Sequence, residues 1–116
     1  MQKKYDVIIA GAGPAGLMTA QVLGEKGARV LLVGRTPERC QAALAAEREV
    51  GRPDCELIQG DLASMAGVRA VAEQVLARTN RLDVLVNNAA AVLVRRTTTP
   101  DGYEATFALN YLSCFF

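Results

Sequence analysis

The stretch DVIIAGAGPAGLMTAQVLGEKGARVLLVGR, residues 6–35, decides the fold of this 116-residue chain. An apolar run over residues 5–10 ends at a glycine, helix-forming residues follow over 15–26, and a second apolar run covers 28–33. Short continuous apolar runs of this kind are typical of strands that are buried on both faces of a sheet. A strand, a helix and a second strand joined by short turns predict a parallel β-α-β unit with a right-handed crossover.

The same alternation of strand and helix continues beyond residue 35. Further elements are expected as a helix from Thr36–Pro37 to about residue 50, a strand over 55–59, a helix through 68–76 that ends near Asn80, a strand over 82–87, and a helix from Asp101, with Glu104 completing a capping box. We therefore predict one α/β domain over residues 1–116. Its expected architecture is a Rossmann-like, doubly wound parallel sheet with four strands in the order 3-2-1-4, a truncated half-domain.

Composition excludes several classes of function. The net charge is +1, with 22% charged and 51% hydrophobic residues, so a nucleic-acid partner is not expected. Three scattered cysteines and no histidine argue against a metal site, a disulfide framework and a Ser-His-Asp triad, and they favour a reducing cytoplasm. The uncharged run 7–24 contains four glycines and a proline, which excludes a membrane span.

The glycines between the first strand and helix form the motif Gly11-x-Gly13-x-x-Gly16. The first glycine permits a tight turn, the second lets the backbone approach a pyrophosphate, and the third lets the helix pack closely on the strand. Free N–H groups at the helix N-terminus favour an anion. The motif predicts a dinucleotide site that includes Ala15 and Leu17 beside the third glycine.

The motif Gly-Ala-Gly-Pro-Ala-Gly at residues 11–16 resembles the FAD-binding segment of flavin monooxygenases, and the resemblance covers residues 5 to about 33. Such segments, like NAD-binding ones, usually end the second strand on an acidic residue that binds the ribose, but this chain has Gly34 followed by Arg35. A cation there suits a 2′-phosphate. We therefore expect NADP(H) rather than FAD or NAD, with Arg39 as a further cation.

Residues 35–116 resemble the short-chain dehydrogenase/reductase family in three segments: GDLAS (60–64), NNAA (87–90) and DGYEATFALNYLSCFF (101–116). The resemblance implies that Asp61 and Leu62 bracket the adenine and that Asn88, Ala89 and Ala90 line the nicotinamide ribose. It also implies that Asn110 is the asparagine that supports a proton-relay water.

Two features depart from that family. Its glycine pattern is GxxxGxG, whereas this turn is GxGxxG, so we consider a chimera or an engineered chain with a junction near residue 34. In addition, no tyrosine is followed four residues later by lysine. Because the family's proton transfer needs that pair, the chain as it stands is predicted to bind a dinucleotide without turnover.

Two alternatives to NADP(H) binding remain open at this point, an FAD-binding module and an engineered structural chain that binds nothing tightly. Self-association is expected through the strand 82–87, which is a bare sheet edge, or through the C-terminal helix, where apolar residues gather.

Overall fold

The structure is a computed structural model that describes residues 7–11, 14–36, 38, 41–42, 45 and 55–115. Its centre is a four-stranded sheet in the order β3-β2-β1-β4, with every neighbouring pair parallel. The strands are β1 (Val7–Ala10), β2 (Val30–Gly34), β3 (Cys55–Gln59) and β4 (Val84–Asn87). The predicted α/β class and the strand order 3-2-1-4 are thereby confirmed.

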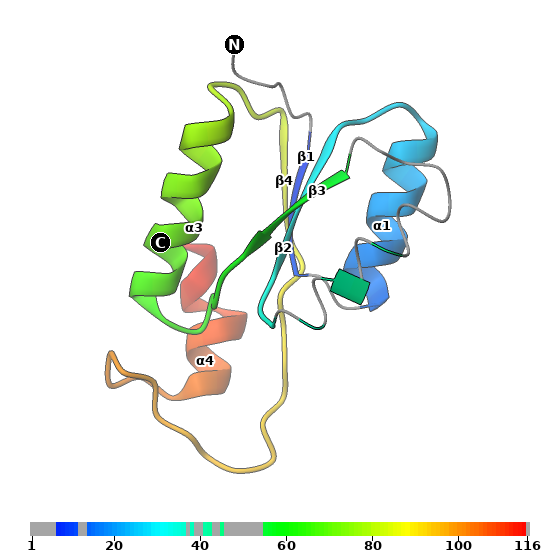
Figure 1. The fold of residues 1–116 in the computed structure, drawn as a ribbon. Coiled ribbons are helices and arrows are strands. Elements are labelled where there is room, and N and C mark those ends of the chain that lie inside the picture. The colour runs from blue at the N-terminus through cyan, green and yellow to red at the C-terminus, as the bar shows by residue number, and fades with distance from the viewer. Residues whose placement is uncertain are drawn as a thin grey trace.

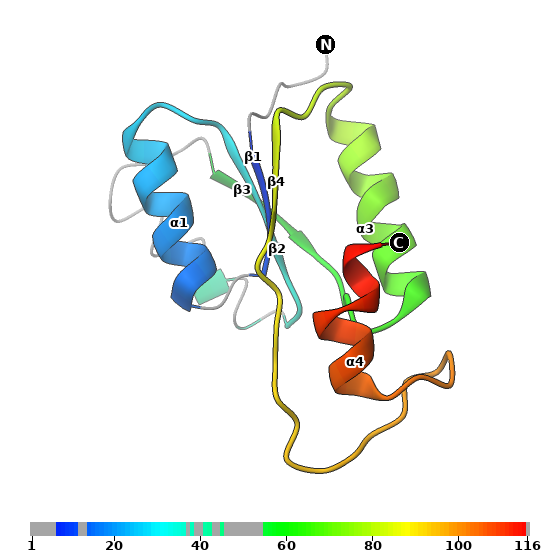
Figure 2. The same ribbon diagram turned by 180° about the vertical axis from the view of Figure 1, so that it is seen from behind.

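Helices cover both faces of the sheet. Helix α1 (Pro14–Glu25) lies on one face, and α3 (Met65–Arg78) and α4 (Ala105–Asn110) lie on the other (Figures 1 and 2). This arrangement places β1 and β2 inside a three-layer sandwich, so their side chains are buried on both faces, as the continuous apolar runs predict.

Alternation along β1 and β2 divides the core into two clusters. The cluster on the α3 face contains Ile8, Leu31, Val33, Ile58 and Val71. The cluster on the α1 face contains Val7, Ile9, Ala20, Val30 and Leu32. Because adjacent side chains of a strand point to opposite faces, one apolar run supplies both clusters.

The start of the fourth helix differs from the sequence prediction. Helix α4 begins at Ala105, and its N-cap is Glu104, whose carboxylate accepts a hydrogen bond from the Phe107 N–H at 2.7 Å. Asp101 does not cap this helix, because its carboxylate accepts a hydrogen bond from the Met65 N–H at the start of α3 (2.9 Å). The helix ends after six residues and is followed by a 3₁₀ turn over Leu112–Cys114.

Some predicted features lie outside the residues that the structure describes. The helix expected after Thr36 lies largely outside the described residues, as do Gly13 and Arg39. Within the described part of the chain, no helix has the length and apolar character needed to cross a bilayer.

Strand β4 forms one edge of this sheet. The side chain of Val84 is 48% exposed and that of Leu85 is 54% exposed, although the interior strands β1 and β2 are almost fully buried. The edge is therefore apolar and open along β4, as the sequence predicts for residues 82–87.

Candidate functional site

The carboxyl ends of all four strands meet at one edge of the sheet, which is the lower edge in Figure 1. The residues that follow the strands stand there in the spatial order Asp61, Arg35, Gly11 and Asn88. Neighbouring strands lie about 4.8 Å apart, so the row spans about 14 Å. In open parallel sheets, ligands bind beyond this edge at the point where the strand order reverses, which here lies between β1 and β4.

The glycine turn after β1 has no room for side chains at two of its glycines. Gly11 has a φ of 123°, and a Cβ there would lie 2.8 Å from the backbone nitrogen of Ala89. A Cβ on Gly16 would overlap the carbonyl oxygen of Gly11. These two glycines therefore let α1 pack closely on the end of β1 and on the segment after β4. Ala15 and Leu17 lie in the first turns of α1.

The segment after β4 packs directly against this turn. The Asn88 N–H donates a hydrogen bond to the carbonyl oxygen of Ala10 at 3.0 Å. The Asn88 side-chain nitrogen would lie 3.1 Å from a Cβ on Gly16, so this amide stands over the start of α1. Ala89 is half-buried and Ala90 is exposed. The structure thus brings the glycine turn together with two of the three predicted residues after β4, Asn88 and Ala89.

The ends of β2 and β3 bring a cation and an anion together. Gly34 pairs with Gln59, and the Gly60 N–H donates to the Gly34 carbonyl oxygen at 2.8 Å. One residue further along each strand end, the Arg35 Nε lies 4.0 Å from Oδ1 of Asp61. Both side chains are substantially exposed, at 71% and 48%.

Leu62, the residue predicted to bracket an adenine together with Asp61, packs against the core cluster on the α3 face. Asp61 itself accepts a hydrogen bond from the Ala63 N–H at 2.9 Å, which fixes its carboxylate at the end of β3. The two residues of this predicted pair therefore point in different directions: Asp61 lies at the edge of the sheet, and Leu62 packs toward the core.

Asn110 is held by the segment that follows β4. Its Oδ1 accepts from the Ala91 N–H at 2.9 Å, and its Nδ2 donates to the Ala91 carbonyl oxygen at 2.9 Å. Both polar atoms of the side chain are therefore hydrogen-bonded to the backbone of one residue, Ala91. This contact fixes the end of α4 beside the residues predicted to line the nicotinamide ribose.

The start of α3 is held by two groups, neither of which was predicted from the sequence. Ser64 Oγ accepts from the Gly67 N–H at 3.0 Å, and Asp101 accepts from the Met65 N–H. Asp101 and Met65 are 36 residues apart, so no local sequence pattern indicates their contact. These bonds satisfy N–H groups that an isolated helix leaves free and tie the loop after β4 to α3.

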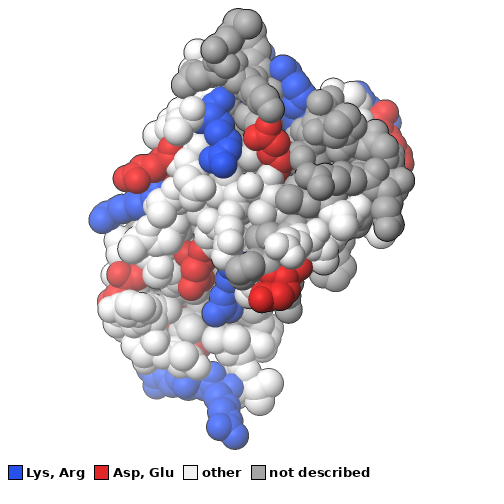
Figure 3. Space-filling view, viewed as in Figure 1, with Lys and Arg blue, Asp and Glu red and all other residues white. Residues whose placement is uncertain are grey.

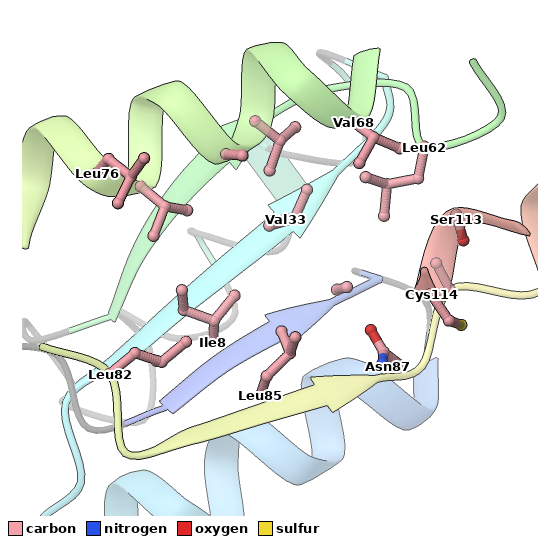
Figure 4. A pocket seen from close by; sticks show the side chains of 15 residues that line it. Ile8, Val33, Leu62, Val68, Leu76, Leu82, Leu85, Asn87, Ser113 and Cys114 are labelled. Atoms are coloured by element: carbon pink, nitrogen blue, oxygen red, sulfur yellow. The ribbon is translucent and has the colours of Figure 1, made fainter. Parts of the chain in front are cut away.

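An apolar cavity of about 310 Å³ lies between α3 and the sheet (Figure 4), and its lining includes Leu62 and Ala89 of the predicted dinucleotide site. Side chains of α3 such as Leu76 and Val68 line one side, Ile8 and Leu85 line the other, and Ser113 and Cys114 of the 3₁₀ turn stand at one end. Its lining contains no charged residue. The cavity is therefore unsuited to a pyrophosphate, which the polar edge of the sheet fits better.

Charge is otherwise mixed on the surface. Figure 3 shows basic and acidic side chains interspersed over one face rather than gathered into an area of one sign. Among the described residues, no group of three or more His, Cys, Asp or Glu side chains has a metal-binding arrangement.

With this geometry, the comparisons with known proteins identify the family. The chain is a Rossmann-like nucleotide-binding unit, and the family model described as short chain dehydrogenase matches residues 4–116. The chain therefore belongs to the short-chain dehydrogenase family. The match runs through the glycine turn and through residue 34 without a break. This continuity gives no support to the predicted change of family or to a chimera.

Relatives of known sequence are considerably longer than this chain. Retinol dehydrogenase 13 of Mus musculus is 39% identical over 111 residues, which cover 94% of this chain and 33% of the mouse protein. The short-chain dehydrogenase/reductase prx1 of Penicillium roqueforti is 36% identical over 115 residues, covering 99% and 33% of the two chains. The chain thus spans about a third of the length of these relatives.

Two solved structures of the family, both determined with NADP, show the same fold. A metagenomic short-chain oxidoreductase in complex with NADP has a TM-score of 0.79 at 31% identity, covering 97% of this chain and 52% of that one. The RhlG/NADP active-site complex of Pseudomonas aeruginosa has a TM-score of 0.74 at 34% identity, covering 98% and 45%. The family and its neighbours together establish a dinucleotide-binding Rossmann fold.

Proposed function

We propose that this chain binds NADP(H) along the carboxyl edge of its sheet. The adenosine lies beside Asp61 and Arg35, the pyrophosphate lies on the glycine turn at the start of α1, and the nicotinamide ribose faces Asn88–Ala90. The observation that carries the proposal is the single row of strand ends, in which Gly11, at the start of the glycine turn, stands between the end that carries Arg35 and Asp61 and the end that carries Asn88.

The residues present fit such a ligand. Gly11 and Gly16 let α1 pack closely on β1 and on the segment after β4, which sets the N-terminus of α1, the end of a helix that favours phosphate, at the carboxyl edge of the sheet. Arg35 supplies an exposed guanidinium, and Gly34 supplies no carboxylate to repel a 2′-phosphate. These two features favour NADP(H) over NAD(H), and the lack of a ribose-binding acid at the end of β2 also disfavours FAD.

Hydride transfer is a separate matter from binding. A bound nicotinamide would supply or accept the hydride, but residues 1–116 contain no Tyr-x-x-x-Lys pair to move the accompanying proton. We propose that Asn110 positions the loop after β4 through Ala91 and that the 116-residue chain binds cofactor without turnover.

A fluorescence titration of the 116-residue protein tests this proposal. NADPH is expected to bind saturably and more tightly than NADH, and Arg35→Ala is expected to weaken NADPH binding with little effect on NADH. Arg81→Ala is the matched control, because Arg81 is an exposed arginine at the opposite edge, paired with Asp83 at 2.8 Å. FAD is titrated in parallel as the alternative ligand. Failure of both nicotinamide cofactors to bind would refute the proposal.

We also propose that the chain self-associates, through β4 or through the C-terminal helical segment. The Phe107 and Tyr111 rings stack with centroids 5.3 Å apart, the tilted ring of Phe115 follows 5.1 Å from Tyr111, and all three are exposed. Exposed aromatic groups and an apolar strand edge both gain free energy when another chain covers them. Light scattering across a concentration series is expected to show a dimer, and a monomer at every concentration would contradict it.

The proposed location is a reducing cytoplasm. Cys114 is an exposed free thiol, and such thiols persist where glutathione and thioredoxin keep them reduced.

A further inference from the structure

The ion pair between Arg35 and Asp61 joins two residues that the sequence assigned to different parts of one nucleotide. Arg35 was expected to bind a 2′-phosphate and Asp61 to bind an adenine. In the structure they are neighbours because β2 and β3 are paired in register up to Gly34 and Gln59. The Arg35 Nε and the Asp61 Oδ1 are 4.0 Å apart. The guanidinium proposed to bind phosphate therefore already has an anionic neighbour.

The two partners differ in how firmly they are held. Asp61 Oδ1 accepts the Ala63 N–H at 2.9 Å, and the carbonyl oxygen of Asp61 packs against Gly67 of α3 so tightly that a Cβ there would overlap it. The Arg35 side chain is 71% exposed and has a long flexible stem. The carboxylate is thus a fixed charge, and the guanidinium is the group that can turn between partners.

We infer that Asp61 competes with the cofactor's 2′-phosphate for Arg35 and thereby lowers the selectivity of the site for NADP(H) over NAD(H). This inference rests on the proposed function. A phosphate monoester carries a charge of about −1.5 to −2 near neutral pH. When it approaches Arg35, the guanidinium must leave Asp61 or share itself between the two anions, and the fixed carboxylate repels the phosphate. Asp61 therefore makes the ratio of affinities for 2′-phosphorylated and unphosphorylated cofactors smaller than Arg35 alone would make it.

The magnitude is limited because both groups are exposed. Interactions of exposed charges at such distances change an equilibrium constant by about two- to fivefold, and salt screens them. The effect must appear as a ratio of affinities, because a contact of Asp61 with adenine would change the binding of phosphorylated and unphosphorylated ligands equally.

Asp61→Asn is the suitable variant. It removes the charge but keeps an oxygen that can accept the Ala63 N–H, so the turn after β3 is retained. Adenosine 2′,5′-bisphosphate and 5′-AMP are the probes, since they share the adenine and differ in the 2′-phosphate. Their affinities are measured by calorimetry for the parent protein, Asp61→Asn, Arg35→Ala and the double variant. Asp83→Asn is the control, because it removes the carboxylate of the Arg81 ion pair at the opposite edge.

In Asp61→Asn the affinity ratio of bisphosphate to 5′-AMP is expected to rise by about two- to fivefold. The rise should shrink at high salt and also in the Arg35→Ala background, where only the direct repulsion of the phosphate by Asp61 remains, and the ratio should be unchanged in Asp83→Asn. An unchanged or lower ratio in Asp61→Asn, with both probes still binding, would overturn this inference and leave the proposed function intact. Failure of both probes to bind the parent protein would overturn the proposed function, and this inference with it.

Discussion

Gly67→Ala is expected to destabilise the protein, although the same change in most helices has the opposite effect. Replacing glycine by alanine inside an exposed helix stabilises it by about 1 kcal/mol. Gly67 lies in the first turn of α3, and a Cβ there would overlap the carbonyl oxygen of Asp61 and lie 2.9 Å from its carbonyl carbon. Both are backbone atoms, which cannot rotate away. The end of β3 and the start of α3 would have to separate.

The magnitude follows from three contributions. Overpacking of this kind costs about 2 kcal/mol. The new Cβ would also crowd Ser64 Oγ, which is 3.0 Å from its position and accepts the Gly67 N–H, and weakening such a cap costs about 1 kcal/mol. Subtracting the gain of about 1 kcal/mol in helix propensity leaves a net loss of about 2 kcal/mol in the free energy of unfolding.

Urea denaturation followed by circular dichroism measures this change. Ala70→Gly is the control, because Ala70 is exposed on the same helix and its replacement reports the propensity difference alone, a loss of about 1 kcal/mol. The reasoning is refuted if Gly67→Ala unfolds at the same or a higher urea concentration than the parent protein while Ala70→Gly shows its expected loss.

Three further changes test contacts around the loop after β4. Asp101→Asn is expected to lower the free energy of unfolding by about 1 kcal/mol, because a neutral amide oxygen caps α3 more weakly than a carboxylate; no loss in urea denaturation would count against the cap. The hydrogen bond from the Phe107 N–H lowers the pKa of Glu104, so its contribution to stability is full above the ordinary value of 4.5 and is lost as pH falls through the lowered pKa. Glu104→Gln should therefore flatten the acid limb of stability against pH, and an unchanged limb would contradict this. Asn110→Ala should cost about 1 kcal/mol and speed hydrogen exchange at the Ala91 amide, which would stay protected if the contact were unimportant.

The sequence predicted the fold well because the signals of a parallel sheet are local. Each buried strand is a short apolar run followed by a turn and a helix, which indicates parallel β-α-β units, and the order 3-2-1-4 is the usual doubly wound arrangement of such units. The boundary of α4 was predicted wrongly for a reason that no local pattern contains. Asp101 has the residue type and spacing of a helix cap, but tertiary packing places it against α3, and Glu104 takes its place.

The candidate site also combines features that the local sequence predicts with contacts that depend on tertiary structure. The glycine turn is visible in the sequence because its residue types are required by its backbone, as the positive φ of Gly11 illustrates. Its close contact with Ala89 depends on how β1 and β4 pair, and the ion pair of Arg35 with Asp61 depends on the pairing of β2 with β3. The sequence therefore predicted these residues as members of the site, but it did not predict that Gly11 contacts Ala89 or that Arg35 pairs with Asp61.

NADP(H) binding along the carboxyl edge of the sheet is tested most directly by mapping amide chemical-shift changes on titration of the isotopically labelled protein with NADP⁺. Binding along the carboxyl edge predicts saturable changes at Gly11, Arg35, Asp61 and Asn88, with little change at Arg81 on the opposite edge. Changes confined to residues that line the apolar cavity beneath α3, or no saturable change at the strand ends, would contradict the account.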